Sequence, residues 1–244
     1  MAIFSSNGLE MHYRVLGQGY PLLLLHGFTG SGELLEELFK DLSTEYQLII
    51  PDMRGHGRSN NPTQRFRFKE VAKDIEGLLE HLKIRECGAI GFSAGASTLL
   101  HVAYQKPTLL KWMVLVSAMP RFTKEAGIVM KAYSAAAKSE EEWAAMRKIH
   151  AHGDEQIKLL WTQAGEFGDD NDDMNFTPEM LSKIETKTLI VQGDNDPFLP
   201  IDVTVDMYKA MPNKALWILP NSGHVPISEK NIMEFKARVR EMDV

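Results

Sequence analysis

The segment Gly91-Phe92-Ser93-Ala94-Gly95 constrains the fold of this chain more than any other stretch. Residues 86–90 before it are small and apolar, which predicts a buried strand, and residues 96–104 after it predict a packed helix. A strand that turns this abruptly into a helix needs glycine on both sides of the serine. The turn also forces the serine into a strained conformation and exposes its hydroxyl at a helix N-terminus, where backbone N–H groups favour negative charge.

Length and charge limit the classes of protein that this chain can belong to. The chain has 244 residues, of which 44% are hydrophobic, and this predicts one α/β domain with a single buried core. The net charge is -6, and the Lys and Arg residues are scattered along the chain. A scattered distribution provides no basic face for nucleic acid and no polybasic anchor for a membrane. A small neutral or apolar ligand is therefore expected.

The only cysteine and the N-terminal segment favour a soluble, cytosolic protein. Cys87 cannot form an intramolecular disulfide, and its place at the start of a predicted buried strand favours a core-filling role over that of a nucleophile. Residues 1–8 lack the basic and apolar regions of a signal peptide, and no apolar run reaches the length of a membrane span. A cytoplasmic protein is expected.

Apolar strands alternate with amphipathic helices over most of the chain, which predicts βαβ units and a mostly parallel sheet with helices on both faces. The first two strands flank Asn7-Gly8, a dipeptide that favours a tight hairpin. The predicted strands are 2–6, 9–16, 21–25, 47–51, 86–90, 112–117, 188–192 and 215–219, and the predicted helices are 32–43, 68–82, 96–104, 202–210 and the C-terminal segment.

The alternation stops between residues 118 and 185. This stretch contains no buried-strand run and is rich in Ala, Lys, Glu, Met and Trp, which predicts a helical insertion. The chain is accordingly divided into a first core part at 1–118, an insertion at 119–185 and a second core part at 186–244.

An exposed serine becomes a nucleophile only when a base accepts its proton and an acidic group orients that base. Both partners are found in loops that follow predicted strands in the last third of the chain. One loop contains Asp194 and Asp196, and the other ends in His224. The order Ser93, Asp196, His224 is typical of a Ser-acid-His catalytic triad, and Asp194 competes with Asp196 for the role of the acid.

With these motifs in order, the chain resembles the α/β-hydrolase superfamily, in its compact esterase, lactonase and C–C hydrolase branch. The resemblance covers essentially all of the chain and includes His26-Gly27-Phe28 and the loop 52–59. It implies an α/β-hydrolase fold: a mostly parallel eight-stranded sheet flanked by helices, with a helical cap inserted over the serine. Ala96 departs from the glycine that many relatives have at this place, and only a small packing adjustment is expected from it.

The resemblance also assigns roles to residues. It implies Ser93, Asp196 and His224 as the catalytic triad, with Asp196 favoured over Asp194 because the family's acid usually lies three residues after the glycine. The backbone N–H groups of Phe28 and Ala94 would form the oxyanion hole. The loop 52–59, and the residues His26 and His56, are interpreted as structural. The apolar residues of the insertion are candidates for the walls of the substrate pocket: Met119, Met130, Trp143, Met146, Trp161 and Phe167.

The function implied is a serine hydrolase that cleaves a small, mostly apolar ester or lactone through an acyl-enzyme, without a cofactor. C–C bond hydrolysis and perhydrolysis on the same scaffold remain alternatives, as does a ligand receptor that keeps the hydrolase fold. Ser93 disfavours haloalkane dehalogenation, which needs a carboxylate at that position. A monomer or homodimer is expected.

Two segments have spacings that partly resemble metal sites. His150-Ala151-His152-Gly153-Asp154 alternates potential ligands, but it has no second matching motif, so no metal is expected there. The acidic segment 168–173 lacks the central glycine and final glutamate of a calcium loop, and we interpret it as a solvated turn.

Overall fold

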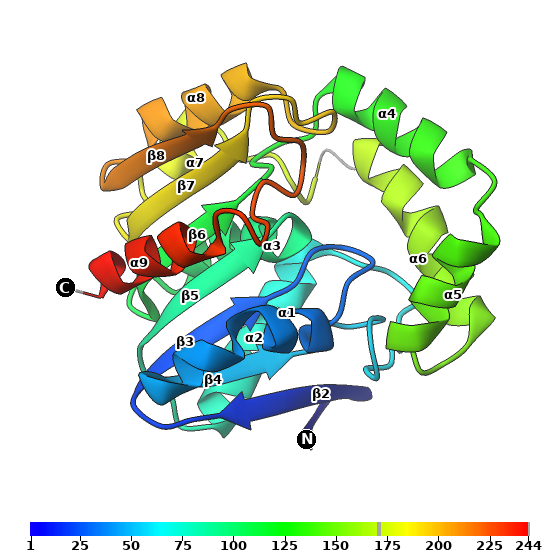
Figure 1. The fold of residues 1–244 in the computed structure, drawn as a ribbon, viewed down its shortest axis with the longest axis horizontal. Helices are drawn as coiled ribbons and strands as arrows, with labels where there is room; N and C mark the ends of the chain where they lie inside the picture. The colour runs from blue at the N-terminus through cyan, green and yellow to red at the C-terminus, as the bar shows by residue number, and fades with distance from the viewer. Residues whose placement is uncertain (170–171, 244) are drawn as a thin grey trace.

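The computed structural model describes residues 1–169 and 172–243. Its centre is one twisted sheet of eight strands in the order β1-β2-β4-β3-β5-β6-β7-β8 (Figure 1). The strands are β1 Ala2–Ser6, β2 Leu9–Leu16, β3 Tyr20–Leu25, β4 Tyr46–Pro51, β5 Cys87–Phe92, β6 Leu110–Val116, β7 Lys187–Gly193 and β8 Lys214–Leu219.

The sheet is parallel from β4 to β8, and its antiparallel pairs are the two that β2 forms. β1 pairs with β2, and β2 pairs with β4, both antiparallel. Asn7 and Gly8 connect the hairpin with φ values of 50° and 80°, the left-handed conformations that a tight turn between twisted strands needs. The predicted hairpin and the mostly parallel eight-stranded sheet are therefore confirmed.

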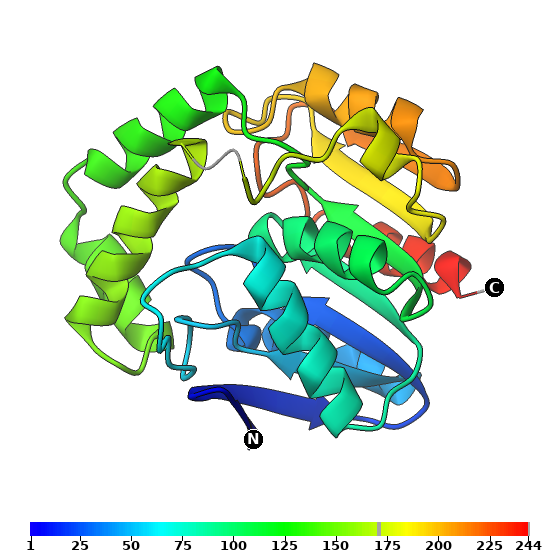
Figure 2. The ribbon, with the colours of Figure 1, turned by 180° about the vertical axis from the view of Figure 1, so that it is seen from behind.

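Helices cover both faces of this sheet (Figures 1 and 2). Apolar residues of α1 and α9 pack on one face, and those of α2, α3 and α8 pack on the other. The helices are α1 Gly32–Phe39, α2 Phe68–His81, α3 Ala94–Gln105, α4 Lys124–Ala135, α5 Glu140–Ile149, α6 Asp154–Glu166, α7 Pro178–Leu181, α8 Ile201–Ala210 and α9 Ile232–Met242.

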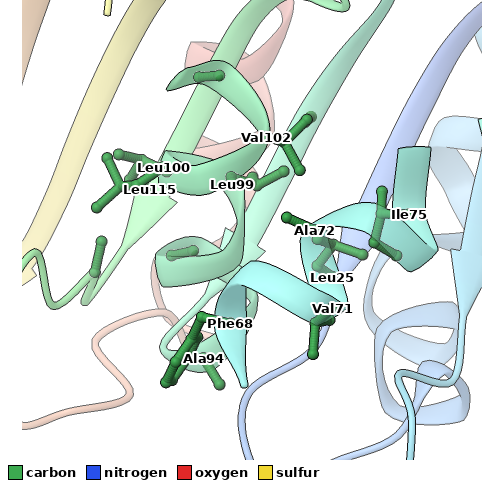
Figure 3. Packing of buried hydrophobic residues seen from close by; sticks show 14 of the residues in the cluster. Leu25, Phe68, Val71, Ala72, Ile75, Ala94, Leu99, Leu100, Val102 and Leu115 are labelled. Carbon is green, nitrogen blue, oxygen red and sulfur yellow. The ribbon is translucent and has the colours of Figure 1, made fainter. Parts of the chain in front are cut away.

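The core lies between the sheet and these helices. Leu25 of β3 packs with Val71 of α2 and Leu99 of α3, and Figure 3 shows these side chains at close range. Strands buried on both faces are uniformly apolar because neither face meets water. Cys87 is fully buried in this core, and burial raises the pKa of its thiol to about 12, which agrees with a packing role.

The first helix is shorter than the periodicity predicts. It ends at Phe39 and continues as a 3₁₀ turn over Lys40–Thr44, where Leu42 remains buried. Leu35 of this helix is buried in the core, whereas the neighbouring Leu34 is 45% exposed.

The insertion between β6 and β7 contains α4, α5 and α6, which stand beyond the carboxyl ends of the parallel strands (Figures 1 and 2). We call these three helices and the following turn Phe167–Asp169 the cap. The segments that enter and leave it pair through a bridge between Arg121 and Asn175. The boundaries at 119 and 185 remain predictions, and positions 170 and 171 of the acidic segment lie outside the described residues.

Within residues 1–169 and 172–243, no helix is long and apolar enough to cross a membrane.

Candidate active site

Ser93 occupies the turn between β5 and α3. Its backbone has φ 49° and ψ -111°, a strained conformation for a residue with a side chain. A Cβ added to Gly91 would lie 2.5 Å from the backbone nitrogen of Ala96, and one added to Gly95 would lie 2.3 Å from the oxygen of Leu25. Both contacts are too close for any side chain, so the turn requires these two glycines.

Three side chains from distant parts of the chain meet at this turn. The Oγ of Ser93 lies 2.8 Å from Nε2 of His224, and Nδ1 of His224 lies 2.7 Å from Oδ2 of Asp196. An ionised carboxylate can only accept, so Nδ1 carries the proton that it donates to Asp196. Nε2 is then free to accept the hydroxyl proton of Ser93.

The carboxylate of Asp196 accepts hydrogen bonds from several neighbouring groups besides His224. Its side chain is fully buried, and Oδ1 accepts the backbone N–H groups of Phe198 and Leu199 at 2.8 and 3.1 Å. Oδ2 also accepts from the side-chain amide of Gln192 at 3.1 Å. Asp194 points elsewhere, since its Oδ1 accepts the backbone N–H of Ser222 at 3.1 Å. The structure therefore places Asp196, and not Asp194, beside His224.

The loop of His224 is fixed by a residue that sequence reasoning missed. Ser117 follows β6 with φ 54°, and its Oγ donates a hydrogen bond of 2.8 Å to the backbone oxygen of His224. The only signal in the sequence was that Ser117 ends a predicted strand next to the strand of Ser93. Parallel neighbours end at the same edge of a sheet, which brings such residues together.

The loop after β3 runs beside Ser93, because a Cβ added to Gly27 would lie 3.5 Å from the Cβ of Ser93. The oxygen of Gly27 lies 2.8 Å from Nδ1 of His26 and accepts from the N–H of Gly30 at 3.0 Å. In a trans peptide the N–H of Phe28 points the opposite way from this oxygen. In the described part of the chain, neither that N–H nor the one of Ala94 has a hydrogen-bond partner.

His26 and His56 support this loop as neutral rings. Nε2 of His26 accepts the N–H of Met53 at 3.0 Å, and Nε2 of His56 accepts the N–H of Thr29 at 3.1 Å. Complete burial lowers the pKa of His26 to about 4 and lowers the pKa of His56 well below its ordinary value. Rings that accept backbone N–H groups in this way have no free nitrogen for proton transfer to a ligand.

The loop 52–59 also has a structural explanation. Oδ1 of the buried Asp52 accepts the N–H of Gly32 at 2.8 Å, and Oδ2 accepts the N–H of Arg58 at 3.0 Å. The guanidinium of Arg54 forms two hydrogen bonds with Asp74, at 2.6 and 2.9 Å. These contacts attach the loop to α1 and α2.

A cavity of about 510 Å³ opens onto Ser93 and His224. No Asp, Glu, Lys or Arg occurs among the described residues that line it. Besides the residues already named around Ser93, its walls include Leu34, Phe68, Met119, Phe122, Met130, Tyr133, Phe167, Phe198 and Val225. Such a cavity suits an uncharged, mostly apolar group.

The six cap residues predicted as pocket walls fall into two groups. Met119, Met130 and Phe167 line the cavity. Trp143, Met146 and Trp161 are absent from the described lining and belong to a second apolar cluster, formed by α5 and α6, against which Phe28 also packs. The rings of Trp143 and Trp161 meet edge to face at 4.6 Å because α5 and α6 turn these side chains toward each other.

Several lining residues were not predicted. Phe198 and Val225 lie close in sequence to Asp196 and His224, so proximity along the chain was an available signal. Phe68 begins α2, and Phe122 precedes α4, where no motif marks them.

The described residues contain no group of three or more His, Cys, Asp or Glu side chains that could hold a metal ion. The rings of His150 and His152 bond to backbone oxygens of different loops, at Thr29 and Arg58. Their alternation in the sequence therefore reflects contacts between the cap and the core.

Comparison with known proteins gives the same fold. The family model described as the alpha/beta hydrolase fold matches residues 20–139. The human protein named serine hydrolase BPHL is 28% identical over 240 residues, covering 89% of this chain and 78% of that protein. A soluble epoxide hydrolase from Corynebacterium sp. (strain C12) is 34% identical over 118 residues, covering only 48% of this chain and 41% of that protein.

The structural comparison extends over the whole chain. The crystal structure of MGS-M2, an alpha/beta hydrolase enzyme from a Medee basin deep-sea metagenome library, superposes with a TM-score of 0.81. The match covers 99% of this chain and 96% of that chain at 20% identity, so it bears on the fold alone. The sequence and structural matches together show that this chain belongs to the α/β-hydrolase superfamily.

Proposed function

We propose that the protein is a serine hydrolase that cleaves a small, mostly apolar ester or lactone through an acyl-enzyme. The observation that carries the proposal is the hydrogen-bonded chain from Ser93 through His224 to Asp196, which opens into an uncharged cavity. Similarity to a relative that is itself named a serine hydrolase supports the proposal.

The first chemical step is attack by Ser93. Its Oγ forms a bond with the carbonyl carbon of the ester while its proton passes to Nε2 of His224. The imidazolium that results is stabilised by the buried carboxylate of Asp196, which accepts Nδ1–H. The pair of electrons from the carbonyl bond moves to the carbonyl oxygen, which becomes an oxyanion.

The oxyanion accepts hydrogen bonds from the backbone N–H groups of Phe28 and Ala94, which have no other partner in the described part of the chain. Ala94 begins α3, so the helix dipole adds to this stabilisation. When the intermediate collapses, His224 gives its proton to the departing alcohol oxygen. Water then attacks the acyl-enzyme, passes a proton to His224, and regenerates Ser93 with release of the carboxylic acid.

The same chemistry argues against epoxide opening, although one partial relative is an epoxide hydrolase. Attack of Ser93 on an epoxide carbon would produce an ether between Oγ and the substrate. An ether has no carbonyl for water to attack, so the triad could not release the product. A carbonyl substrate leaves an ester on Ser93, which the same base can hydrolyse.

A series of p-nitrophenyl esters from acetate to palmitate tests the proposal. Each methylene of the acyl group that is buried in the cavity adds about 0.8 kcal/mol of favourable binding free energy. The value of kcat/KM should therefore rise over the first few carbons and fall once the acyl group is longer than the cavity. Ser93→Ala should abolish turnover of every ester in the series.

A charged ester provides the second part of this test. The described lining contains no cationic side chain, so a phosphorylated ester or a coenzyme A ester should be a poor substrate. A maximum at long chains, or a strong preference for the anionic ester, would contradict the small apolar pocket.

A further inference from the structure

His150 reaches from the cap into the core loops around the cavity. It lies at the turn between α5 and α6, and its side chain is almost completely buried. Its Nδ1 accepts the N–H of Gly57 at 2.9 Å, so the proton of the neutral ring lies on Nε2. Nε2 then donates to the backbone oxygen of Thr29 at 3.1 Å.

Thr29 is a residue whose backbone needs such support. It is β-branched and has φ 63°, a conformation that costs about 1–3 kcal/mol unless its surroundings hold it. Its N–H donates to His56 of the core, and its oxygen accepts from His150 of the cap. Imidazole rings from two different parts of the chain thus hold both backbone polar groups of this strained residue.

Thr29 follows Phe28 in the chain and lies in the same turn, which orients the N–H of Phe28. The turn 27–30 is closed by the hydrogen bond from Gly30 to the oxygen of Gly27, and that oxygen sets the direction of the Phe28 N–H. The ring of Phe28 contacts Phe167 of the cap edge to face at 4.7 Å. If Thr29 relaxed to an unstrained conformation, the turn and the Phe28 N–H would both shift.

We propose that His150 is a positioning residue through which the cap holds the oxyanion loop, residues 26–30, in the conformation needed for catalysis. The inference rests on the proposed function, in which the Phe28 N–H stabilises the oxyanion. His150 is absent from the described lining of the cavity, so it acts through Thr29 and not on the substrate. Loss of this hydrogen bond affects the transition state more than substrate binding.

The cap has other contacts with the core that do not involve Thr29. The N–H of Ala151 donates to the oxygen of Gly57 at 2.9 Å, and Nε2 of His152 donates to the oxygen of Arg58 at 2.9 Å. These bonds attach the same turn of the cap to the loop 52–59. Because these bonds do not involve Thr29, substitutions can distinguish the attachment of the cap from the support of Thr29.

Two substitutions of His150 each keep one of its two hydrogen bonds and remove the other. In His150→Asn the side-chain oxygen takes the place of Nδ1 and keeps the bond from Gly57, but no group reaches Thr29. In His150→Gln the amide nitrogen takes the place of Nε2 and keeps the donor to Thr29. We expect kcat for the best p-nitrophenyl ester to fall about 10- to 100-fold in the Asn variant, with KM within about twofold. The Gln variant should retain most of the activity.

His152→Ala is the matched control, because it removes a contact from the same turn without affecting Thr29. Its kcat should stay within about twofold of the wild type. An unchanged kcat in His150→Asn, or an equal loss in His152→Ala, would overturn the proposal.

Hydrogen exchange of the oxyanion loop tests the same inference without any activity. The amides of Thr29 and Gly30 should exchange at least about tenfold faster in His150→Asn than in the wild type, and at the wild-type rate in His150→Gln and His152→Ala. Unchanged exchange in the Asn variant would refute the positioning role. A wild-type protein that hydrolysed none of the esters would refute the proposed function, while this exchange result would still decide the role of His150.

Discussion

The sheet and the cap shape the same cavity by different means. The sheet supplies Ser93, Asp196 and His224, each in a loop directly after a parallel strand, where ladder hydrogen bonds and buried backbone contacts fix their positions. The cap supplies Met130 and Phe167, whose positions depend on how helices pack. The triad side chains of the proposed reaction are thus built into the core, whereas the cap forms part of the pocket wall and contacts the oxyanion loop through His150.

The largest expected effect tests the core side of this comparison. Asp196→Asn should lower kcat at least about 10²-fold with little change in stability, because the amide no longer fixes the tautomer of His224. Asp194→Asn is the matched control, since Asp194 accepts only turn groups such as the N–H of Ser222. Its kcat should be close to that of the wild type. Similar losses in the two variants would show that the acid is wrongly assigned.

The second prediction concerns pH and two buried histidines. Burial lowers the pKa of His26 and of His101 to about 4, against about 6.5 in the unfolded chain. Between these two values the unfolded chain binds protons that the folded chain does not, so stability must fall as the pH drops below about 6.5. Each histidine should lower the free energy of unfolding by about 2 kcal/mol between pH 7 and pH 5, measured by urea denaturation.

His101→Leu sharpens this measurement. The ring of His101 packs 4.7 Å from that of Phe176, a residue of the segment that leaves the cap, and its Nε2 has no partner among the described residues. The free energy of unfolding should differ between pH 7 and pH 5 by about 2 kcal/mol less in the variant than in the wild type. The same pH dependence in variant and wild type would mean that His101 is not the group that titrates.

The smallest effect tests the cap side. Phe167→Ala should enlarge the cavity and move the optimum of the ester series to longer chains, with a gain of about fourfold in kcat/KM for each extra methylene that fits. Trp161→Ala should lower stability without moving the optimum, because Trp161 packs inside the cap. The distinction between wall and cap interior would be wrong if both variants shifted the optimum equally.

The core could be predicted well from the sequence because its signals are local and ordered. Uniformly apolar runs such as 21–25 predicted strands, and the Gly-x-Ser-x-Gly segment predicted the turn at Ser93. Chain order then placed an acid and a histidine after later strands of the same sheet. The choice between Asp194 and Asp196 depended on the family resemblance, because both lie in one loop and only the folded loop shows which carboxylate faces His224.

The cap could not be predicted at the same level. Met119, Met130 and Phe167 have the same apolar character as Trp143, Met146 and Trp161, and composition does not reveal the rotation of a helix that decides which side chains face the cavity. His150 illustrates the same limit, because its partners Thr29 and Gly57 are about a hundred residues away in the chain. Contacts of this kind are set by tertiary packing, and no local pattern marks them.

The most direct measurement of the central claim is labelling with a fluorophosphonate probe followed by peptide mapping. Only a serine whose proton can pass to a neighbouring base reacts quickly with such a probe. The account predicts one label, on Ser93, with labelling slowed strongly in Asp196→Asn and unchanged in Asp194→Asn. A label on another serine, or full esterase activity in Ser93→Ala, would contradict it.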